Sequence, residues 1–126
     1  MPAHTFHELL RERSSPRAFL PEPLPRAVIT SMIEAARWAP SSMNDQPWRF
    51  VVAERGTPSF AAVLGTLKPK NQRWAKHAGA LFVVVAREHF DHDRSPNRWA
   101  QYDTGAAAFS LVLQAEAHGL GSHQMG

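Results

Sequence analysis

A loop at residues 40–48, with the sequence Pro-Ser-Ser-Met-Asn-Asp-Gln-Pro-Trp, carries side chains that are suited to holding a ligand. The two prolines stiffen the loop, because each fixes its own φ and restricts the residue before it. Two hydroxyls and two carboxamides lie between them, and all four groups can donate and accept hydrogen bonds. Such neutral groups suit a planar heterocycle edged with carbonyls and N–H groups, such as a flavin. A polar surface turn is the alternative that the composition leaves open.

Arg13, Ser15 and Arg17 alternate along a segment in which Pro16 disfavours helix. In an extended backbone they project to one side, so two guanidinium groups flank a hydroxyl. That arrangement can clamp a phosphate, since arginine presents planar and permanently charged donors. The alternative is that these arginines and Arg11 complement a helix end and face water. The chain has no glycine-rich phosphate motif, so arginines would have to bind any phosphate.

Several isolated residues further along the chain give weaker signals. Asn71 is expected in a loop before an apolar strand, where an asparagine often shapes a turn. Trp74, Trp99 and Tyr102 could wall a pocket or pack in the core. Asp103 could be buried against a polar partner, lie beside a ligand, or face solvent.

Metal and nucleophilic catalysis are not expected. Residues 89–93 contain His89, Asp91, His92 and Asp93, but this charged loop shows no groups that would orient metal ligands. The histidines elsewhere have no nucleophile partner in sequence, and no Gly-x-Ser-x-Gly motif occurs. We therefore assign no metal site and no catalytic acid or base.

The apolar pattern predicts the elements that would position these residues. Helices are expected at residues 4–12, 25–39, 57–67 and 97–118, and strands at 48–53 and 80–86, with a polar connection at 68–76. The helix at 25–39 has an apolar stripe formed by Val28, Ile29, Met32, Ile33 and Ala36.

Two of the expected elements are more apolar than a half-buried element needs to be. The strand at 80–86 is continuously apolar, so it is expected to be buried on both faces. The helix is almost wholly apolar and alanine-rich over residues 105–117, so it is expected to be buried all round, with a subunit interface against its small side chains. Gly119 suits the left-handed position that ends this helix.

The composition limits the class of protein. The chain of 126 residues, 44% hydrophobic and 20% charged, is expected to form one folded domain. The lack of cysteine excludes disulfides and thiolate chemistry, and it fits a cytoplasmic protein without a secretion signal. No apolar run reaches the roughly 18 residues of a membrane span. The net charge of +3 is scattered, which argues against nucleic-acid binding.

Taken in order, these motifs resemble those of the flavin-dependent nitroreductase family. The matching features are Arg-x-Ser-x-Arg-x-Phe at 13–19, Pro-Ser-Ser-x-Asn-x-Gln-Pro-Trp at 40–48, Asn71, the apolar strand at 80–86, Asp-x-Gly at 103–105 and Gly-Leu-Gly-Ser at 119–122. The resemblance spans nearly the whole chain, and the Pro-Ser-Ser loop is its most specific part.

The resemblance implies an α+β fold, namely an α/β/α sandwich with a central and mainly antiparallel sheet. It implies that residues 1–126 are a single FMN-binding domain of an intertwined homodimer, in which both subunits contribute to each of two FMN sites. Family members continue beyond the position of Gly126 with a strand that carries basic residues and a tail that wraps the partner. The C-terminal part of the domain is therefore expected to be missing.

The resemblance also implies roles for individual residues. Those expected at the FMN phosphate and ribityl chain are Arg13, Ser14, Ser15 and Arg17, and Asn71 is expected at the polar edge of the flavin. Those expected from the partner subunit are Pro40, Ser41, Ser42 and Asn44. Asp103 falls where a helix residue approaches the flavin, and Gln124, Met125 and Gly126 match the segment that lies against the isoalloxazine ring.

The implied activity is that of an FMN-dependent NAD(P)H oxidoreductase. NADH or NADPH would pass hydride to flavin N5, and an acceptor such as a nitroaromatic or a quinone would then enter the same space, which gives ping-pong kinetics. The alternative is a flavin-binding or dimerisation module without turnover.

Overall fold

Two antiparallel strands with helices on both sides make up the computed structural model, which describes residues 4–126. The elements in chain order are α1 (Glu8–Glu12), α2 (Arg26–Arg37), the short 3-10 helix η1 (Ser42–Asn44), β1 (Trp48–Glu54), α3 (Pro58–Thr66), α4 (Pro69–Ala75), β2 (Ala80–Ala86) and α5 (Ala100–Ala117). β1 and β2 pair in a register that runs from Trp48 opposite Ala86 to Glu54 opposite Ala80.

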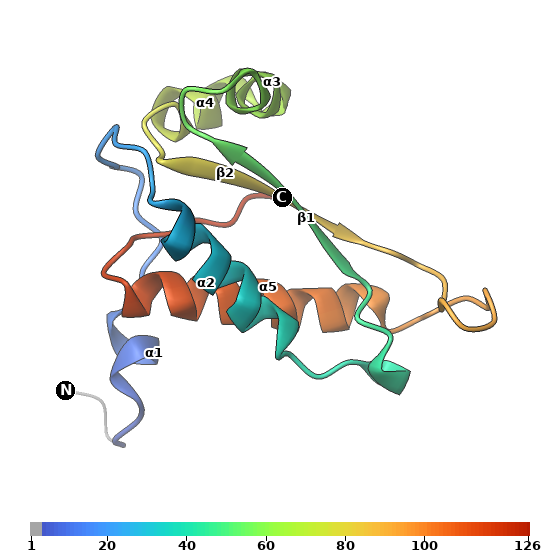
Figure 1. Cartoon of the computed structure of the whole chain (residues 1–126). Coiled ribbons are helices and arrows are strands. Elements are labelled where there is room, and N and C mark those ends of the chain that lie inside the picture. The colour runs from blue at the N-terminus through green and yellow to red at the C-terminus, as the bar shows by residue number, and fades with distance from the viewer. Residues whose placement is uncertain (1–3) are drawn as a thin grey trace.

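The helices cover the two faces of this sheet in separate layers (Figure 1). On one face, α2 and α5 pack against β1 through a cluster that includes Met32, Trp48 and Leu111. On the other face, α3 and α4 pack against one end of the sheet, where Ala53 and Leu81 are buried. The helix–sheet–helix arrangement confirms the predicted α+β sandwich.

Local signals in the sequence set several helix ends. Thr57 caps α3, because its side chain accepts a hydrogen bond from the N–H of Phe60, and Pro58 occupies the first turn. Gly119 has φ of 72°, and it lets the N–H of Leu120 reach the carbonyl of Ala115 at 2.9 Å. Both helix ends confirm the sequence-based expectations.

The prediction of a polar connection at residues 68–76 is wrong, because Pro69–Ala75 form α4. Proline is favourable in the first turn of a helix, and lysine, glutamine and arginine are good helix formers. A seven-residue helix is too short to show a clear apolar stripe, although Ala75 is buried. Asn71 therefore lies in a helix and not in the predicted loop.

The prediction that the strand at 80–86 is buried on both faces is also wrong. Val83, Val84 and Val85 are exposed on β2. The packed cluster on the α3–α4 side includes Ala53 and Leu81, at one end of the sheet. The described sheet has two strands, so β2 has no third strand beside it. The apolar run therefore predicted the strand correctly, but it did not predict which faces of the strand are covered.

Two helix predictions need correction as well. α5 begins at Ala100, and it is not buried all round, because Phe109 is 40% exposed and a Cβ at Gly105 would meet open space. α2 packs along one side of α5 and leaves the other side open. The helix expected at residues 4–12 is shorter in the structure, where α1 covers only Glu8–Glu12. None of its residues is buried, so tertiary packing does not stabilise a longer helix. Within residues 4–126, no helix combines the length and hydropathy that crossing a membrane requires.

Candidate functional site

The loop between α2 and β1 has an unusual backbone. Met43, Asn44 and Gln46 have φ values of 56°, 51° and 49°. Residues other than glycine seldom adopt this left-handed region, and asparagine is the most tolerant of them. Such conformations persist where the surrounding structure holds them, and they cluster at functional sites.

Asp103 holds one side of this loop. The carboxylate is 6% exposed, and its Oδ2 accepts a hydrogen bond from the backbone N–H of Ser42 at 2.9 Å. Within the loop, Ser41 Oγ accepts a hydrogen bond from the N–H of Gln46 at 3.0 Å. The sequence left three environments possible for Asp103. In the structure, its carboxylate is buried against a polar partner.

Asp45 holds the other side of the loop. Its side chain is 2% exposed and accepts hydrogen bonds from Arg87 Nη2 at 3.0 Å and from the N–H of Asp91 at 2.8 Å. Asn97, which is also buried, donates a longer bond of 3.4 Å to the same carboxylate. The loop is therefore tied both to α5 and to the segment that follows β2.

The surroundings of Asp45 favour its ionised form. Burial alone raises the pKa of this carboxyl, but hydrogen bonds from Asp91 and Arg87 and the charge of Arg87 outweigh burial, so the pKa of Asp45 is below its ordinary value of 3.8. Sequence reasoning missed Arg87 and Asn97. The available signal was that Asp45 is the only charged residue of the loop and would need a cation or donors if buried.

The arginine segment, residues 13–19, is irregular and lies beyond α1. Arg13 Nη1 donates to Ser15 Oγ at 3.3 Å, whereas Arg17 is exposed. Among residues 4–126, no acidic side chain forms an ion pair with either arginine. Two uncompensated guanidinium groups beside serine hydroxyls fit an anionic ligand such as a phosphate.

The arginine segment meets α4 and the C-terminal segment, residues 120–126. Phe19 stacks on Trp74 with ring centroids 6.1 Å apart, and Met125 packs in the same cluster as Trp74. Asn71 lies one turn before Trp74, so both side chains are on the same side of α4. Phe19 at the end of the arginine segment, Trp74 on the helix that carries Asn71, and Met125 of the C-terminal segment are thus neighbours.

The remaining candidate residues lie elsewhere. Pro40, Ser41, Ser42 and Asn44 belong to the loop that Asp103 holds near the start of α5, whereas the arginine segment meets the chain after the end of α5 (Figure 1). The 15 residues from Asp103 to Ala117 span roughly 21 Å along the helix axis. Within one chain, the Ser42 loop therefore lies near the start of α5, and the arginine segment lies beside the chain that follows the end of α5.

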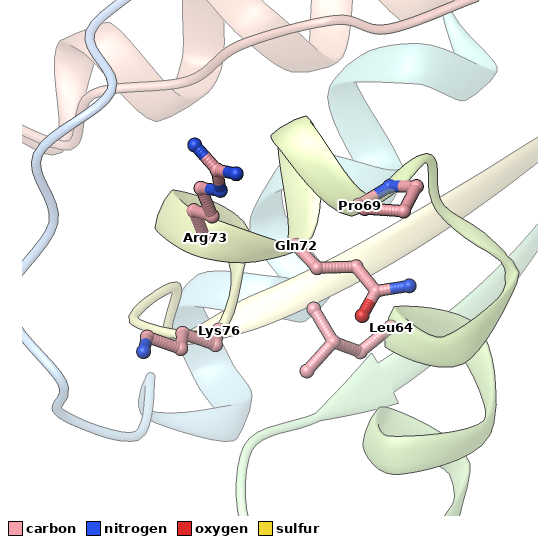
Figure 2. Close-up of a pocket in the computed structure, with 5 residues that line it drawn as sticks. All are labelled: Leu64, Pro69, Gln72, Arg73 and Lys76. Atoms are coloured by element: carbon pink, nitrogen blue, oxygen red, sulfur yellow. The ribbon is translucent and has the colours of Figure 1, made fainter.

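The described residues form two surface cavities. One, of about 390 Å³, is lined by Glu88, Pro96, Asn97, Arg98, Ala100 and Gln101. The other, of about 270 Å³, lies between α3 and α4 and is shown in Figure 2 with its lining residues Leu64, Pro69, Gln72, Arg73 and Lys76. Neither cavity is lined by a residue that the sequence assigned to cofactor binding.

The aromatic candidates have different environments. Trp74 is packed, whereas Trp99 is 50% exposed and Tyr102 is 79% exposed. Trp99 is the N-cap residue of α5, and Tyr102 lies in the first turn of this helix. In residues 4–126, no group of three or more histidine and acidic side chains is arranged to bind a metal ion.

Comparisons with known proteins point to one family. A sequence model of the Nitroreductase family matches residues 10–62 and 54–126. YfhC of Bacillus subtilis (strain 168), which carries the provisional name NAD(P)H nitroreductase, is 32% identical over 118 residues, covering 83% of this chain and 58% of YfhC. Iodotyrosine deiodinase 1 of Rattus norvegicus is 44% identical over 99 residues, covering 72% of this chain and 35% of the deiodinase.

The same comparison holds at the level of structure. A crystal structure described as an oxidoreductase containing FMN matches with a TM-score of 0.95 and 38% sequence identity. The match covers 100% of this chain and 65% of that chain. This chain thus spans less than two thirds of the length of each of these three proteins.

Proposed function

Because this chain belongs to the nitroreductase family, we propose that it is a single FMN-binding domain, residues 1–126, of an NAD(P)H-dependent oxidoreductase. The family match and the FMN named for the structure of TM-score 0.95 support this proposal. A cytoplasmic location is part of it, and the absence of cysteine is compatible with that location.

In this proposal the group at the end of α5 holds one part of the cofactor. Arg13, Ser14, Ser15 and Arg17 bind the phosphate and ribityl chain, and the support is that the two arginines have no acidic partner in the described chain. Asn71 binds the polar edge of the flavin. The segment Gln124–Gly126 lies against the ring, which fits its position in the structure beside α4.

The second group comes from a second copy of the chain. Pro40, Ser41, Ser42 and Asn44 of one subunit face the cofactor held by the other, with Asp103 behind them. The observation that carries this proposal is that the Ser42 loop is bonded to Asp103 near the start of α5, whereas the arginine segment is bonded to His123, which follows the end of α5. The exposed valines of β2 and the exposed Phe109 supply apolar surface for a homodimer.

When bound, FMN supplies the redox chemistry, taking electrons from NADH or NADPH and passing them to an electron-poor acceptor in alternating steps. The chain's own residues bind and orient the cofactor. Asn71 donates a hydrogen bond to the flavin, and no side chain needs to act as an acid, a base or a nucleophile. The proposed acceptors are nitroaromatics or quinones.

An absorbance experiment on the purified protein tests this function. We expect the protein with FMN to be yellow, to bleach when NADH or NADPH is added without oxygen, and to recover its colour with a quinone or a nitroaromatic. A yellow protein that never bleaches with either donor would instead support a flavin-binding or dimerisation module without turnover.

Reductive dehalogenation is a second candidate activity, because the 44% identity to iodotyrosine deiodinase 1 exceeds the 32% identity to YfhC. A parallel assay with an iodinated phenol separates the two candidates. Iodide release with no reduction of nitroaromatics would favour dehalogenation.

A further inference from the structure

The arginine segment and the C-terminal segment are in direct contact, although each lies outside the helices and strands. His123 Nδ1 lies 3.0 Å from the carbonyl oxygen of Pro16, across 107 residues of sequence. Both residues are half-buried. In Figure 1 the blue chain that follows α1 passes beside the red chain that follows α5.

Gly121 allows this close approach. A Cβ atom added at Gly121 would lie 2.8 Å from Pro16 Cγ and 3.9 Å from Phe19 Cε1. The first distance is shorter than real Cβ contacts, so a larger residue would push the two segments apart. Pro16 therefore lies against the C-terminal segment both at Gly121 and at His123.

The contact with Pro16 determines the tautomer of His123. A carbonyl oxygen can only accept, so Nδ1 must carry the proton that is shared with it. In the neutral ring, Nε2 is then unprotonated, and protonation of the ring adds a proton at Nε2. The hydrogen bond to Pro16 consequently exists in both charge states of the ring.

The imidazole of His123 packs against an aromatic side chain. Its ring centroid lies 4.6 Å from that of Trp74 with the ring planes tilted by 39°, and Trp74 also stacks on Phe19, at 6.1 Å and 24°. Trp74 belongs to the α3–α4 side of the core, so the stack attaches both segments to a folded element.

We propose that His123 is a positioning residue that fastens the arginine segment to the C-terminal segment through its Nδ1–H bond to Pro16. This inference rests on the proposed function, because it gives His123 a role in holding the phosphate-binding arginines at a fixed place relative to Gln124–Gly126. Without the bond, both segments would have to be ordered when FMN binds, and that ordering lowers affinity.

The first test is the tautomer itself, measured on the full chain without FMN. Two- and three-bond ¹H–¹⁵N NMR correlations at a pH where His123 is neutral should show a protonated Nδ1 and an unprotonated Nε2. The opposite tautomer would overturn the proposal, since it cannot donate from Nδ1 to Pro16.

The second test uses trypsin, which can cut after Arg17 within the arginine segment. In the protein without FMN, His123→Leu should raise the rate of cleavage between Arg17 and Ala18 by about two- to tenfold. The reason is that loss of one hydrogen bond increases, by about that factor, the fraction of molecules in which the arginine segment is detached and accessible to trypsin. Cleavage after Arg94, in an exposed loop, serves as the internal reference. His77→Leu, at an exposed histidine after α4, should change neither rate.

His123→Asn separates the hydrogen bond from packing, because its amide NH₂ lies near the position of Nδ1 and can donate to Pro16. Its cleavage rate after Arg17 should return toward that of the unmodified protein. An unchanged rate in His123→Leu, or equally raised rates in both variants, would overturn the proposal. If His123→Leu does not fold, the tautomer measurement still decides the question.

FMN titration links the contact to the proposed function. We expect His123→Leu to weaken FMN binding by about two- to tenfold and His123→Asn to weaken it less. If the unmodified protein fails to bind FMN while the tautomer and cleavage results hold, the proposed function fails and the positioning contact stands. If FMN binds equally well to all three proteins, the positioning role is overturned.

Discussion

The Oδ2 atom of Asp103 accepts a hydrogen bond of 2.9 Å from the backbone N–H of Ser42, across 61 residues of sequence. This bond attaches the start of α5 to a loop in which three residues have left-handed backbone. An aspartate that the sequence associates with a cofactor therefore also has a structural task, which is to hold the polar loop in one conformation.

Replacement of Asp103 measures this task. Asp103→Ala leaves a Ser42 N–H without its partner beneath the loop, so we expect a loss of about 1–3 kcal/mol in the free energy of unfolding, the cost of an unsatisfied buried donor. Urea unfolding of Asp103→Ala, Asp103→Asn and the exposed control Gln101→Ala provides the comparison. Asp103→Asn keeps an acceptor oxygen and should lose less stability. Equal stability of Asp103→Ala and Gln101→Ala would show that the bond contributes little.

Arg17→Ala should weaken FMN binding and leave the fold intact. A charge-assisted hydrogen bond contributes about 1.5–3 kcal/mol, which corresponds to roughly a tenfold to a hundredfold change in the dissociation constant. Fluorescence titration with FMN gives this constant, and circular dichroism reports the fold. Arg11→Ala is the matched control, because Arg11 pairs with Glu8 and Glu12 on α1. Unchanged affinity in Arg17→Ala would argue against the phosphate clamp.

The ion pair of Asp45 with Arg87 makes stability depend on pH in the acid range. The pKa of Asp45 is lower in the folded chain than its ordinary value of 3.8, so the unfolded chain binds a proton first as the pH falls. The stabilisation is therefore fully present above about pH 5, and it is lost as the pH falls through 3.8 and then through the folded pKa. Urea unfolding between pH 7 and pH 3 should show this decline.

Two variants isolate the contribution of Asp45 to that profile. Asp45→Asn should be less stable at pH 7 and should lose less stability between pH 5 and pH 3. Asp93→Asn is the comparison, since hydrogen bonds from Ser95 also lower the pKa of Asp93, and this exposed carboxylate should contribute a smaller part of the same decline. If the stability of Asp45→Asn depends on pH in the same way as that of the unmodified protein, Asp45 does not cause the acid-range loss of stability.

Mixing two defective variants tests whether a site is shared between subunits. Arg17→Ala removes the proposed phosphate contact, and Ser42→Leu adds bulk to the loop that faces the partner's cofactor. Each variant alone should bind FMN weakly. After they are unfolded and refolded together, random pairing in a two-fold dimer should restore about a quarter of the sites, because each mixed dimer then has one site with both elements intact.

The oligomeric state of each variant is the control for this experiment. Light scattering of each variant should give a dimer at micromolar concentration, so that a failure to pair is recognised before FMN is added. Dimers that regain no FMN binding after mixing would show that both elements act on the same cofactor from one chain, or on none.

Local chemistry made part of this structure predictable. Thr57 and Pro58 began a helix where the sequence placed one, and Gly119 ended α5 with the expected left-handed backbone. The motifs at residues 13–19 and 40–48 were also visible, because they depend on residue types in a short span. The helix at Pro69–Ala75 was missed because seven residues with few apolar side chains leave almost no periodic pattern.

Burial could not be read from composition in the same way. The run at 80–86 is a strand because β-branched residues favour extended backbone, yet Val83–Val85 are exposed because neighbouring elements decide what covers a strand. The partners of Asp45 were likewise hidden, because Arg87 and Asn97 are 42 and 52 residues away in sequence.

By itself, the sequence determined which short segments carry arginines, hydroxyls and carboxamides of the kinds that suit a phosphate or a flavin, since those properties belong to the residues and their spacing. Only the tertiary structure decided how these segments are distributed. α5 is a rigid rod that holds the Ser42 loop at its start, and the contacts of His123 hold the arginine segment beyond its end. Because these contacts join residues 61 and 107 positions apart, only the folded chain shows where the loop and the arginine segment lie along α5.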